Sequence, residues 1–189
     1  MTTENHPLQP FLPAHAHTLF LGSFPPPKTR WSMDFFYPNW MNDFWRIMGL
    51  IHYGDKTRFE IQGEKRFDRQ RITHFATEQG LAFYDTATQV CRLKDNASDQ
   101  FLEIVQPTDI TALLGHIPHC TQLVTTGGKA SEQLQAWFAI PTIPAIGNCL
   151  PLQTDGRILQ WWRMPSTSRA YPLSLEKKAE YYKKLFKTA

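Results

Sequence analysis

Short apolar runs alternate along the chain with segments in which apolar residues recur at helical spacing. The apolar runs resemble buried parallel strands and lie at residues 17–24, 81–90, 120–128 and 156–166. The amphipathic segments predict helices at residues 40–52, 69–80, 108–117, 129–139 and 173–187. Because strands and helices alternate, we expect an α/β fold, a three-layer α/β/α arrangement with a central, mostly parallel four-stranded sheet.

Polar and glycine residues mark the expected ends of these elements. Asp109 and Ser174 stand where helix N-caps are expected, and Gly80 stands where a helix would stop. Residues 1–16 contain several Pro and His residues and read as an N-terminal arm. The remainder, 17–189, shows no repeat and no composition shift, so we predict a single domain.

Composition excludes several classes of protein. A chain of 189 residues can bury a full core, and no apolar run approaches the roughly 20 residues of a membrane span. The N-terminus does not have the pattern of a secretory signal. The three cysteines form no CxxC pair, and the histidines show no HxxxH spacing, so we expect neither disulfides nor a metal site. We therefore expect a reduced, cytoplasmic protein, a monomer without membrane contact.

Net charge and aromatic content are weaker indications of what the protein binds. The formal net charge is +3, which allows a polyanionic partner without requiring one. Aromatic residues make up 13% of the chain. Many of them crowd into "RWSMDFFYPNWMNDFW" (30–45), directly after the first apolar run.

The segments that follow the four predicted strands are where chemistry is expected, because ligands of such sheets bind beyond the carboxyl ends of the strands. The first of them, "GSFPPP" (22–27), has a glycine that permits a sharp turn and prolines that stiffen the exit. A rigid turn would explain this segment without any site. It matches neither a dinucleotide-binding loop nor a P-loop.

The segment after the fourth strand is "MPSTSRAYP" (164–172). The hydroxyls and backbone N–H groups of residues 166–168 can grip a phosphate, and Arg169 can add a charged contact. Tyr171 can stack on bases or wedge between them. An ordinary Ser/Thr turn before the last helix is the alternative.

The aromatic segment also has two interpretations. Its rings can belong to the core, but Pro38 indicates that residues 36–39 form a loop, and loop aromatics beside amides suit a flipped base.

Two acidic residues have plainer explanations than catalysis. Asp85 can brace a loop at a strand end, and Asp43 can favour a helix start through the helix dipole, although it is also a rival water activator.

Two of these segments together resemble the active-site motifs of a known family. "LFLGSFPPPKTR…FFYPNWMNDFWRIM" and "RMPSTSRAYP" are similar to the first and last motifs of the uracil-DNA glycosylase superfamily, nearest to its hypoxanthine-DNA (deoxyinosine) and mismatch-specific branch. "AFYDTATQVCR" and "LVTTGGKAS" resemble the intervening segments in the same order. The resemblance covers residues 17 to 187.

The resemblance implies a DNA glycosylase of base excision repair, a hydrolase that cleaves the N-glycosidic bond of a uracil- or hypoxanthine-class base. The expected partner is damaged or mismatched DNA, duplex or single-stranded, and no cofactor is expected. The expected catalytic residues are Asn42, which would orient the attacking water, and Ser23, near which backbone N–H groups would read the edge of the base. The expected base-binding residues are Phe24, Phe36, Tyr37, Asn39 and Thr126. The expected DNA-binding residues are Ser166, Thr167, Ser168, Arg169 and Tyr171.

The chain departs from the family pattern at several positions. Phe24 stands where the best-known uracil enzymes have their water-activating Asp, Thr126 stands where a base-reading Asn is expected, and Met164 replaces a His. Two other functions therefore remain open: a nucleic-acid-binding module that has lost catalysis, and a hydrolase of a free nucleoside or nucleotide. An α/β domain with an aromatic core and ordinary loops is the third possibility.

Overall fold

The computed structural model describes residues 3–93, 101–154 and 156–186. Its main sheet has five strands in the order β3-β2-β6-β8-β7. These strands are β2 (Thr18–Gly22), β3 (Leu81–Asp85), β6 (Gln122–Thr126), β7 (Asn148–Thr154) and β8 (Arg157–Met164). The first four in the order run parallel, and β7 is antiparallel to β8.

The prediction of four strands is wrong by one, because β7 was not recognised. This strand lies at the sheet edge, contains Pro151, and has exposed and half-buried residues over its first half. A proline is tolerated on an edge strand, where one lost ladder hydrogen bond matters little, but it hides the strand from pattern analysis. Three of the four predicted strands, and the first half of the predicted strand 81–90, belong to the parallel part of this sheet.

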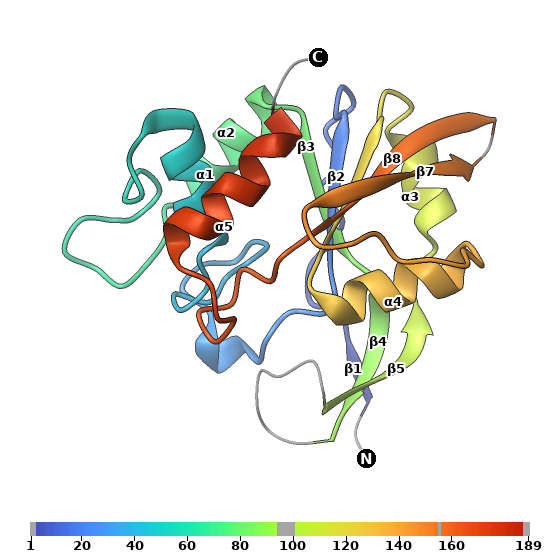
Figure 1. Ribbon diagram of the computed structural model, residues 1–189. Helices are drawn as coiled ribbons and strands as arrows, with labels where there is room; N and C mark the ends of the chain where they lie inside the picture. The colour runs from blue at the N-terminus through green and yellow to red at the C-terminus, as the bar shows by residue number, and fades with distance from the viewer. Residues whose placement is uncertain (1–2, 94–100, 155, 187–189) are drawn as a thin grey trace.

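A second, antiparallel sheet of three strands in the order β1-β4-β5 lies below the carboxyl end of the main sheet in Figure 1. It consists of β1 (Thr3–Asn5), β4 (Ala87–Arg92) and β5 (Leu102–Pro107). The predicted strand 81–90 is therefore two strands in different sheets. The chain turns at Thr86, whose N–H donates to the Gly22 carbonyl, while the Thr108 hydroxyl donates to the Asp85 carbonyl.

Helices cover both sides of the main sheet. α1, α2 and α5 gather on one side and α3 and α4 on the other (Figure 1). The helices are α1 (Phe44–Tyr53), α2 (Arg69–Glu78), α3 (Ile110–His116), α4 (Gly128–Trp137) and α5 (Leu175–Tyr182), with short 3₁₀ turns at Lys28–Arg30 and Lys183–Phe186. The side chains of Asp109 and Ser174 cap α3 and α5 as predicted. Residue 187, the last of the predicted final helix, lies outside the described residues.

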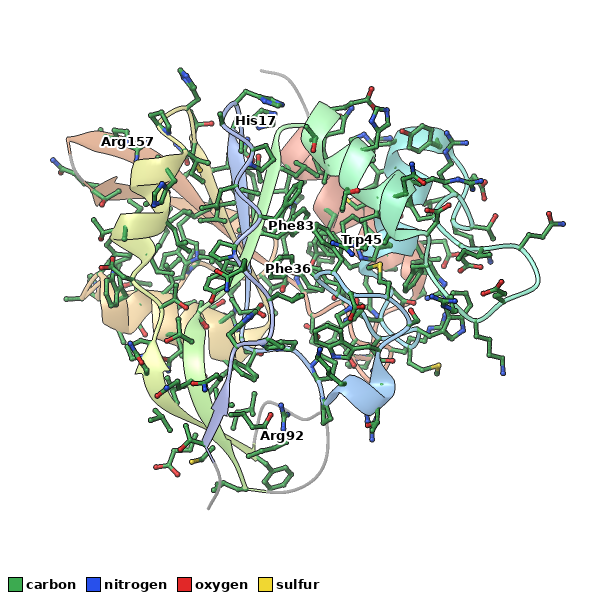
Figure 2. All side chains as sticks on the ribbon, turned by 180° about the vertical axis from the view of Figure 1, so that it is seen from behind. His17, Phe36, Trp45, Phe83, Arg92 and Arg157 are labelled. Carbon is green, nitrogen blue, oxygen red and sulfur yellow. The ribbon has the colours of Figure 1, made fainter. Side chains whose placement is uncertain are left out.

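An aromatic core fills the space between the main sheet and the α1 side. Phe83 of β3 stacks on Phe36 with ring centroids 5.9 Å apart and contacts Trp45 of α1 at 5.5 Å (Figure 2). Part of the aromatic segment therefore belongs to the core, which is one of the two interpretations of this segment.

In the described part of the chain, no helix is long and apolar enough to cross a membrane.

Candidate functional site

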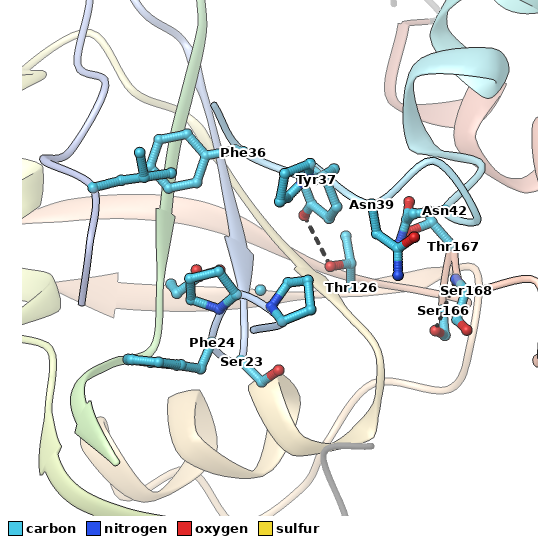
Figure 3. A pocket seen from close by; sticks show the side chains of 16 residues that line it. Ser23, Phe24, Phe36, Tyr37, Asn39, Asn42, Thr126, Ser166, Thr167 and Ser168 are labelled. Atoms are coloured by element: carbon cyan, nitrogen blue, oxygen red, sulfur yellow. Dashed lines mark hydrogen bonds between the residues drawn. The ribbon is translucent and has the colours of Figure 1, made fainter. Parts of the chain in front are cut away.

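The carboxyl ends of the parallel strands meet at one edge of the main sheet. Gly22 of β2 pairs with Asp85 of β3, and Thr126 of β6 pairs with Met164 of β8. A cavity of about 130 Å³ opens at this edge. It is lined by residues from the first strand end, the aromatic segment, the β3 and β6 ends and the loop after β8 (Figure 3).

All the site residues predicted from the sequence line this cavity except Arg169 and Tyr171. The lining residues among them are Ser23, Phe24, Phe36, Tyr37, Asn39, Asn42, Thr126, Ser166, Thr167 and Ser168. The two motifs from opposite ends of the chain are joined directly. Asn42 forms a β-bridge with Ser168, and the Asp43 N–H donates to the Thr167 carbonyl at 2.8 Å.

Aromatic side chains form one part of the cavity wall. In Figure 3, Phe24 and Phe36 lie on the side of the cavity away from the Ser166–Ser168 loop, with Tyr37 and Thr126 between the two sides. Both Phe side chains are buried. Aromatic rings are therefore concentrated on one side of the cavity, and the hydroxyls of the Ser166–Ser168 loop lie on the other.

Tyr37 is held in an unusual conformation. Its φ is 53°, in the left-handed region that non-glycine residues rarely adopt. Its ring stacks on Phe44 at 3.9 Å, and its hydroxyl shares a 2.9 Å hydrogen bond with that of Thr126. Burial raises the pKa of Tyr37 far above its usual range, so the hydroxyl keeps its proton at neutral pH. Backbone strain of this kind is concentrated at functional sites.

The two amide side chains each bond to the local backbone. Oδ1 of Asn39 accepts from the Met41 N–H, and Oδ1 of Asn42 accepts from the Phe44 N–H, both at 2.9 Å. These bonds explain why α1 begins at Phe44 rather than at residue 40, because such local bonds compete with helical ones. Asn42 therefore precedes the helix and lies at the cavity wall. An amide oxygen accepts two hydrogen bonds, so one acceptor position remains for a water.

Asp43 forms ion pairs with two side chains of the protein and does not line the cavity. Its Oδ1 accepts from Nε of Arg169 at 3.0 Å, and its Oδ2 accepts from Nζ of Lys178 at 3.1 Å. Lys178 is completely buried and also donates to the Ser168 carbonyl at 2.8 Å. The three charges join the start of α1 to the loop after β8. This arrangement argues against Asp43 as the water activator.

The hydroxyl loop also has the features of a Ser/Thr turn. The Ser166 hydroxyl accepts from the Ser168 N–H at 3.3 Å, and the Ser168 hydroxyl accepts from the Ala170 N–H at 3.2 Å. Both side chains nevertheless line the cavity. The turn interpretation and the phosphate-binding interpretation are therefore compatible.

Sequence analysis missed Asp85 and His6 as members of the site. Asp85 lines the cavity as its only acidic residue among the described residues, and its Oδ2 lies 2.9 Å from Nε2 of His6. The position of Asp85 at a strand end could have indicated its place in the site, because Gly22 ends the neighbouring parallel strand at the same edge of the sheet. A Cβ at Gly22 would overlap Oδ1 of Asp85, so the glycine makes room for the carboxylate. Nothing in the sequence around His6 indicated a place in the site, because its contact with Asp85 joins two residues that are far apart in the chain.

The described residues contain no group of three or more His, Cys, Asp or Glu side chains placed to hold a metal ion. Asp43 and Asp85 do not form a pair, because they belong to two different environments. Asp43 binds two cations outside the cavity, and Asp85 binds His6 at its wall.

Comparison with known proteins gives one informative result. No family model matches the chain. No curated protein sequence matches it either. Among solved structures, the chain is similar to a protein from Methanosarcina acetivorans whose NMR structure carries the name "putative Uracil DNA glycosylase", with a TM-score of 0.67 and 16% identity over 98% of this chain and 97% of that one. The chain therefore shares, over almost its whole length, the fold of that glycosylase-like protein.

Proposed function

We propose that this protein is a DNA glycosylase that removes a uracil-class base from DNA by hydrolysing its N-glycosidic bond. The observation that carries the proposal is the cavity at the carboxyl edge of the sheet, with aromatic rings on one side and the Ser166–Ser168 loop on the other. The shared fold with the Methanosarcina protein supports it. Such an enzyme must hold a nucleotide outside the base stack, and a cavity with aromatic rings on one side and hydroxyls on the other suits a base and its phosphates.

The size of the cavity favours a single ring. A protein cavity of about 150 Å³ holds one benzene molecule, and this cavity measures about 130 Å³. A volume of this size is nearer to a single-ring base such as uracil than to the two-ring hypoxanthine. The resemblance to the hypoxanthine-specific branch is thus a weaker guide to the substrate than the resemblance to the superfamily.

Polar groups at the wall are suited to the edge of an oxopyrimidine such as uracil, which carries carbonyl and ring N–H groups. The Asp85 carboxylate can accept a hydrogen bond only, so it favours a base with a ring N–H, such as uracil, over cytosine, whose N3 is itself an acceptor. The Tyr37 and Thr126 hydroxyls share one hydrogen bond, so one of the two keeps a free O–H that can donate to a carbonyl. Leaving a buried polar group unpaired costs about 1–3 kcal/mol, which corresponds to roughly 5- to 150-fold discrimination.

The reaction requires a positioned water and no cofactor. The water oxygen bonds to C1′ of the deoxyribose as the C1′–N bond to the base breaks. One water proton stays on the new C1′ hydroxyl of the abasic site, and the other balances the charge of the released base nitrogen. Asn42 would hold the water through the remaining acceptor position of its amide oxygen. An amide is a weak base, so positioning and electrostatic stabilisation would supply most of the rate.

The decisive test is single-turnover release of base from duplexes and single strands that contain uracil, hypoxanthine or a G·T mismatch. We expect release from uracil-containing DNA, scored as abasic sites cleaved by alkali, and slower release of hypoxanthine. DNA binding without release of any base would instead favour a binding module that has lost catalysis. Release from free deoxyuridine without affinity for DNA would favour a nucleoside hydrolase.

Replacing Arg169 with alanine tests the proposed phosphate contact. Arg169 lies beside the hydroxyl loop and its side chain is 39% exposed, so part of the guanidinium can reach DNA while Nε holds Asp43. We expect weaker binding to all sequences alike, and a slope of log K against log salt that is smaller by about one unit. Lys177→Ala removes an exposed charge elsewhere on the molecule and serves as the matched control. An altered sequence preference with an unchanged salt slope would contradict a phosphate contact.

A further inference from the structure

The N-terminal arm reaches the candidate site. β1 pairs with β4, and the His6 N–H continues this pairing by donating to the Thr88 carbonyl at 2.8 Å. Leu8 then lines the cavity. The His6 side chain is only 2% exposed. The arm is therefore packed against the wall of the cavity rather than lying free on the surface.

Both nitrogens of the His6 ring are engaged. Nδ1 lies 3.1 Å from the Leu8 nitrogen and 2.9 Å from the Leu8 oxygen, and Nε2 lies 2.9 Å from Oδ2 of Asp85. If Nδ1 accepts from the Leu8 N–H, the ring proton is on Nε2; if the ring is charged, both nitrogens carry protons. A neutral ring with its proton on Nδ1 would place two acceptors, Nε2 and Oδ2, face to face at 2.9 Å, so in the two states that remain Nε2 donates to Asp85.

Ring packing fixes the histidine further. The His6 ring meets Phe24 edge to face, with centroids 5.3 Å apart at 77°, and lies 4.6 Å from the ring of Tyr84. Phe24 and Asp85 are both cavity residues. The histidine therefore lies behind the cavity wall and contacts two of the residues that form it.

The hydrogen bond from His6 gives the Asp85 carboxylate a defined orientation. Oδ2 is occupied, whereas Oδ1 has no hydrogen-bond partner among the described residues and lies against Gly22, another cavity residue. Oδ1 is thus the carboxylate oxygen that has both of its acceptor positions open to a ligand. Donation from His6 also offsets part of the negative charge, which makes the carboxylate more compatible with an electron-rich base.

We infer that His6 is a positioning residue for base selection: it holds Asp85 so that Oδ1 accepts a hydrogen bond from the ring N–H of the bound base. The inference rests on the proposed function and adds the N-terminal arm to the specificity machinery. It also accounts for the glycine at position 22, since any side chain there would displace the oriented oxygen.

The test uses free bases, so it does not depend on turnover. Binding of 1-methyluracil, whose only ring N–H is at N3, and of 1,3-dimethyluracil, which has no ring N–H, is measured by NMR titration of the full chain. We expect the wild-type protein to prefer 1-methyluracil about tenfold, the scale of one unpaired buried polar group. His6→Phe keeps a ring against Phe24 but lacks the donor, and it should lose the preference. His6→Gln supplies an N–H donor and should recover most of it.

Two further variants separate the possible outcomes. His15→Phe changes another histidine of the same arm, which contacts Thr77 instead of the cavity, and should keep the preference. Asp85→Leu should lose it. If folded His6→Phe keeps the wild-type preference while Asp85→Leu loses it, the role assigned to His6 is wrong and the proposed function stands.

Absence of any preference in the wild-type protein would also overturn the inference, and the duplex assay would then decide separately whether the protein is a glycosylase. If His6→Phe does not fold, His6→Gln decides. A folded His6→Gln protein without the preference would contradict positioning by a hydrogen-bond donor.

Discussion

Replacing Asn42 with alanine is expected to slow base release by about 100-fold or more, the usual scale for losing a catalytic positioning contact. Asn42 lines the cavity where the aromatic segment meets the loop after β8. Its amide oxygen already accepts from the Phe44 N–H, and its second acceptor position is the one proposed for the water. The measurement is the single-turnover rate on uracil-containing duplex at saturating enzyme.

The same substitution also removes a bond at the start of α1, so stability must be measured alongside the rate. Loss of a helix-start acceptor costs about 1 kcal/mol. Asn42→Asp provides the control, because a carboxylate retains an acceptor for the Phe44 N–H and another for a water. We expect Asn42→Asp to keep its stability and a rate within about tenfold of wild type. A destabilised Asn42→Ala protein with an unchanged rate would leave Asn42 with a structural role alone.

The strand ends were the part of the site that sequence could predict. β2 is an uninterrupted buried strand that ends at Gly22, and β8 ends just before the Ser166–Ser168 loop. Parallel neighbours place their carboxyl ends at the same sheet edge, so residues about 140 positions apart lie around one cavity. The boundaries and the direction of the strands are enough to bring these residues to the same edge.

Element boundaries that depend on side-chain hydrogen bonds were harder to predict. The pattern at residues 40–52 is helical in spacing, but the amides of Asn39 and Asn42 hold a turn and delay the helix to Phe44. The apolar run 81–90 is continuous in sequence, yet the chain bends at Thr86 into a second sheet. In both places, hydrogen bonds within a turn satisfy backbone groups that a continuous helix or strand would otherwise pair. The helix or strand boundary therefore differs from the one that hydrophobic periodicity predicts.

The contribution of the N-terminal arm could not be predicted at all. A lone histidine in a proline-containing segment has no pattern that indicates its partner. His6 reaches Asp85 only because β1 adds to the edge of β4, and that pairing joins residues more than 80 positions apart. Asp85 was identified in the sequence as a residue that braces a loop, and its place at the cavity wall follows from the alignment of β3 with β2.

Loss of the buried ion pair between Asp43 and Lys178 is expected to have the largest effect on stability. Lys178→Met should lower the free energy of unfolding by about 3–5 kcal/mol, because it leaves a buried carboxylate with one cation fewer. The lysine is completely buried and bonds both Asp43 and the Ser168 carbonyl. Urea denaturation followed by tryptophan fluorescence measures the loss. The neighbouring Lys177→Met, on an exposed side chain, should change stability by less than about 0.5 kcal/mol.

The same pair should couple stability to DNA binding, because it fastens the hydroxyl loop to the start of α1. In a double-mutant cycle with Asp43→Asn, the two substitutions together should cost clearly less than the sum of their separate costs, since each removes the same interaction. Lys178→Met should also weaken DNA binding at temperatures where the protein is still folded, as the Ser168 carbonyl loses its donor and the loop is released. Additive costs, or a loss below about 1 kcal/mol for Lys178→Met, would mean that Arg169 alone satisfies Asp43. The loop would then be held by its backbone bonds to Asn42 and Asp43, and the buried lysine would not be needed to shape the site.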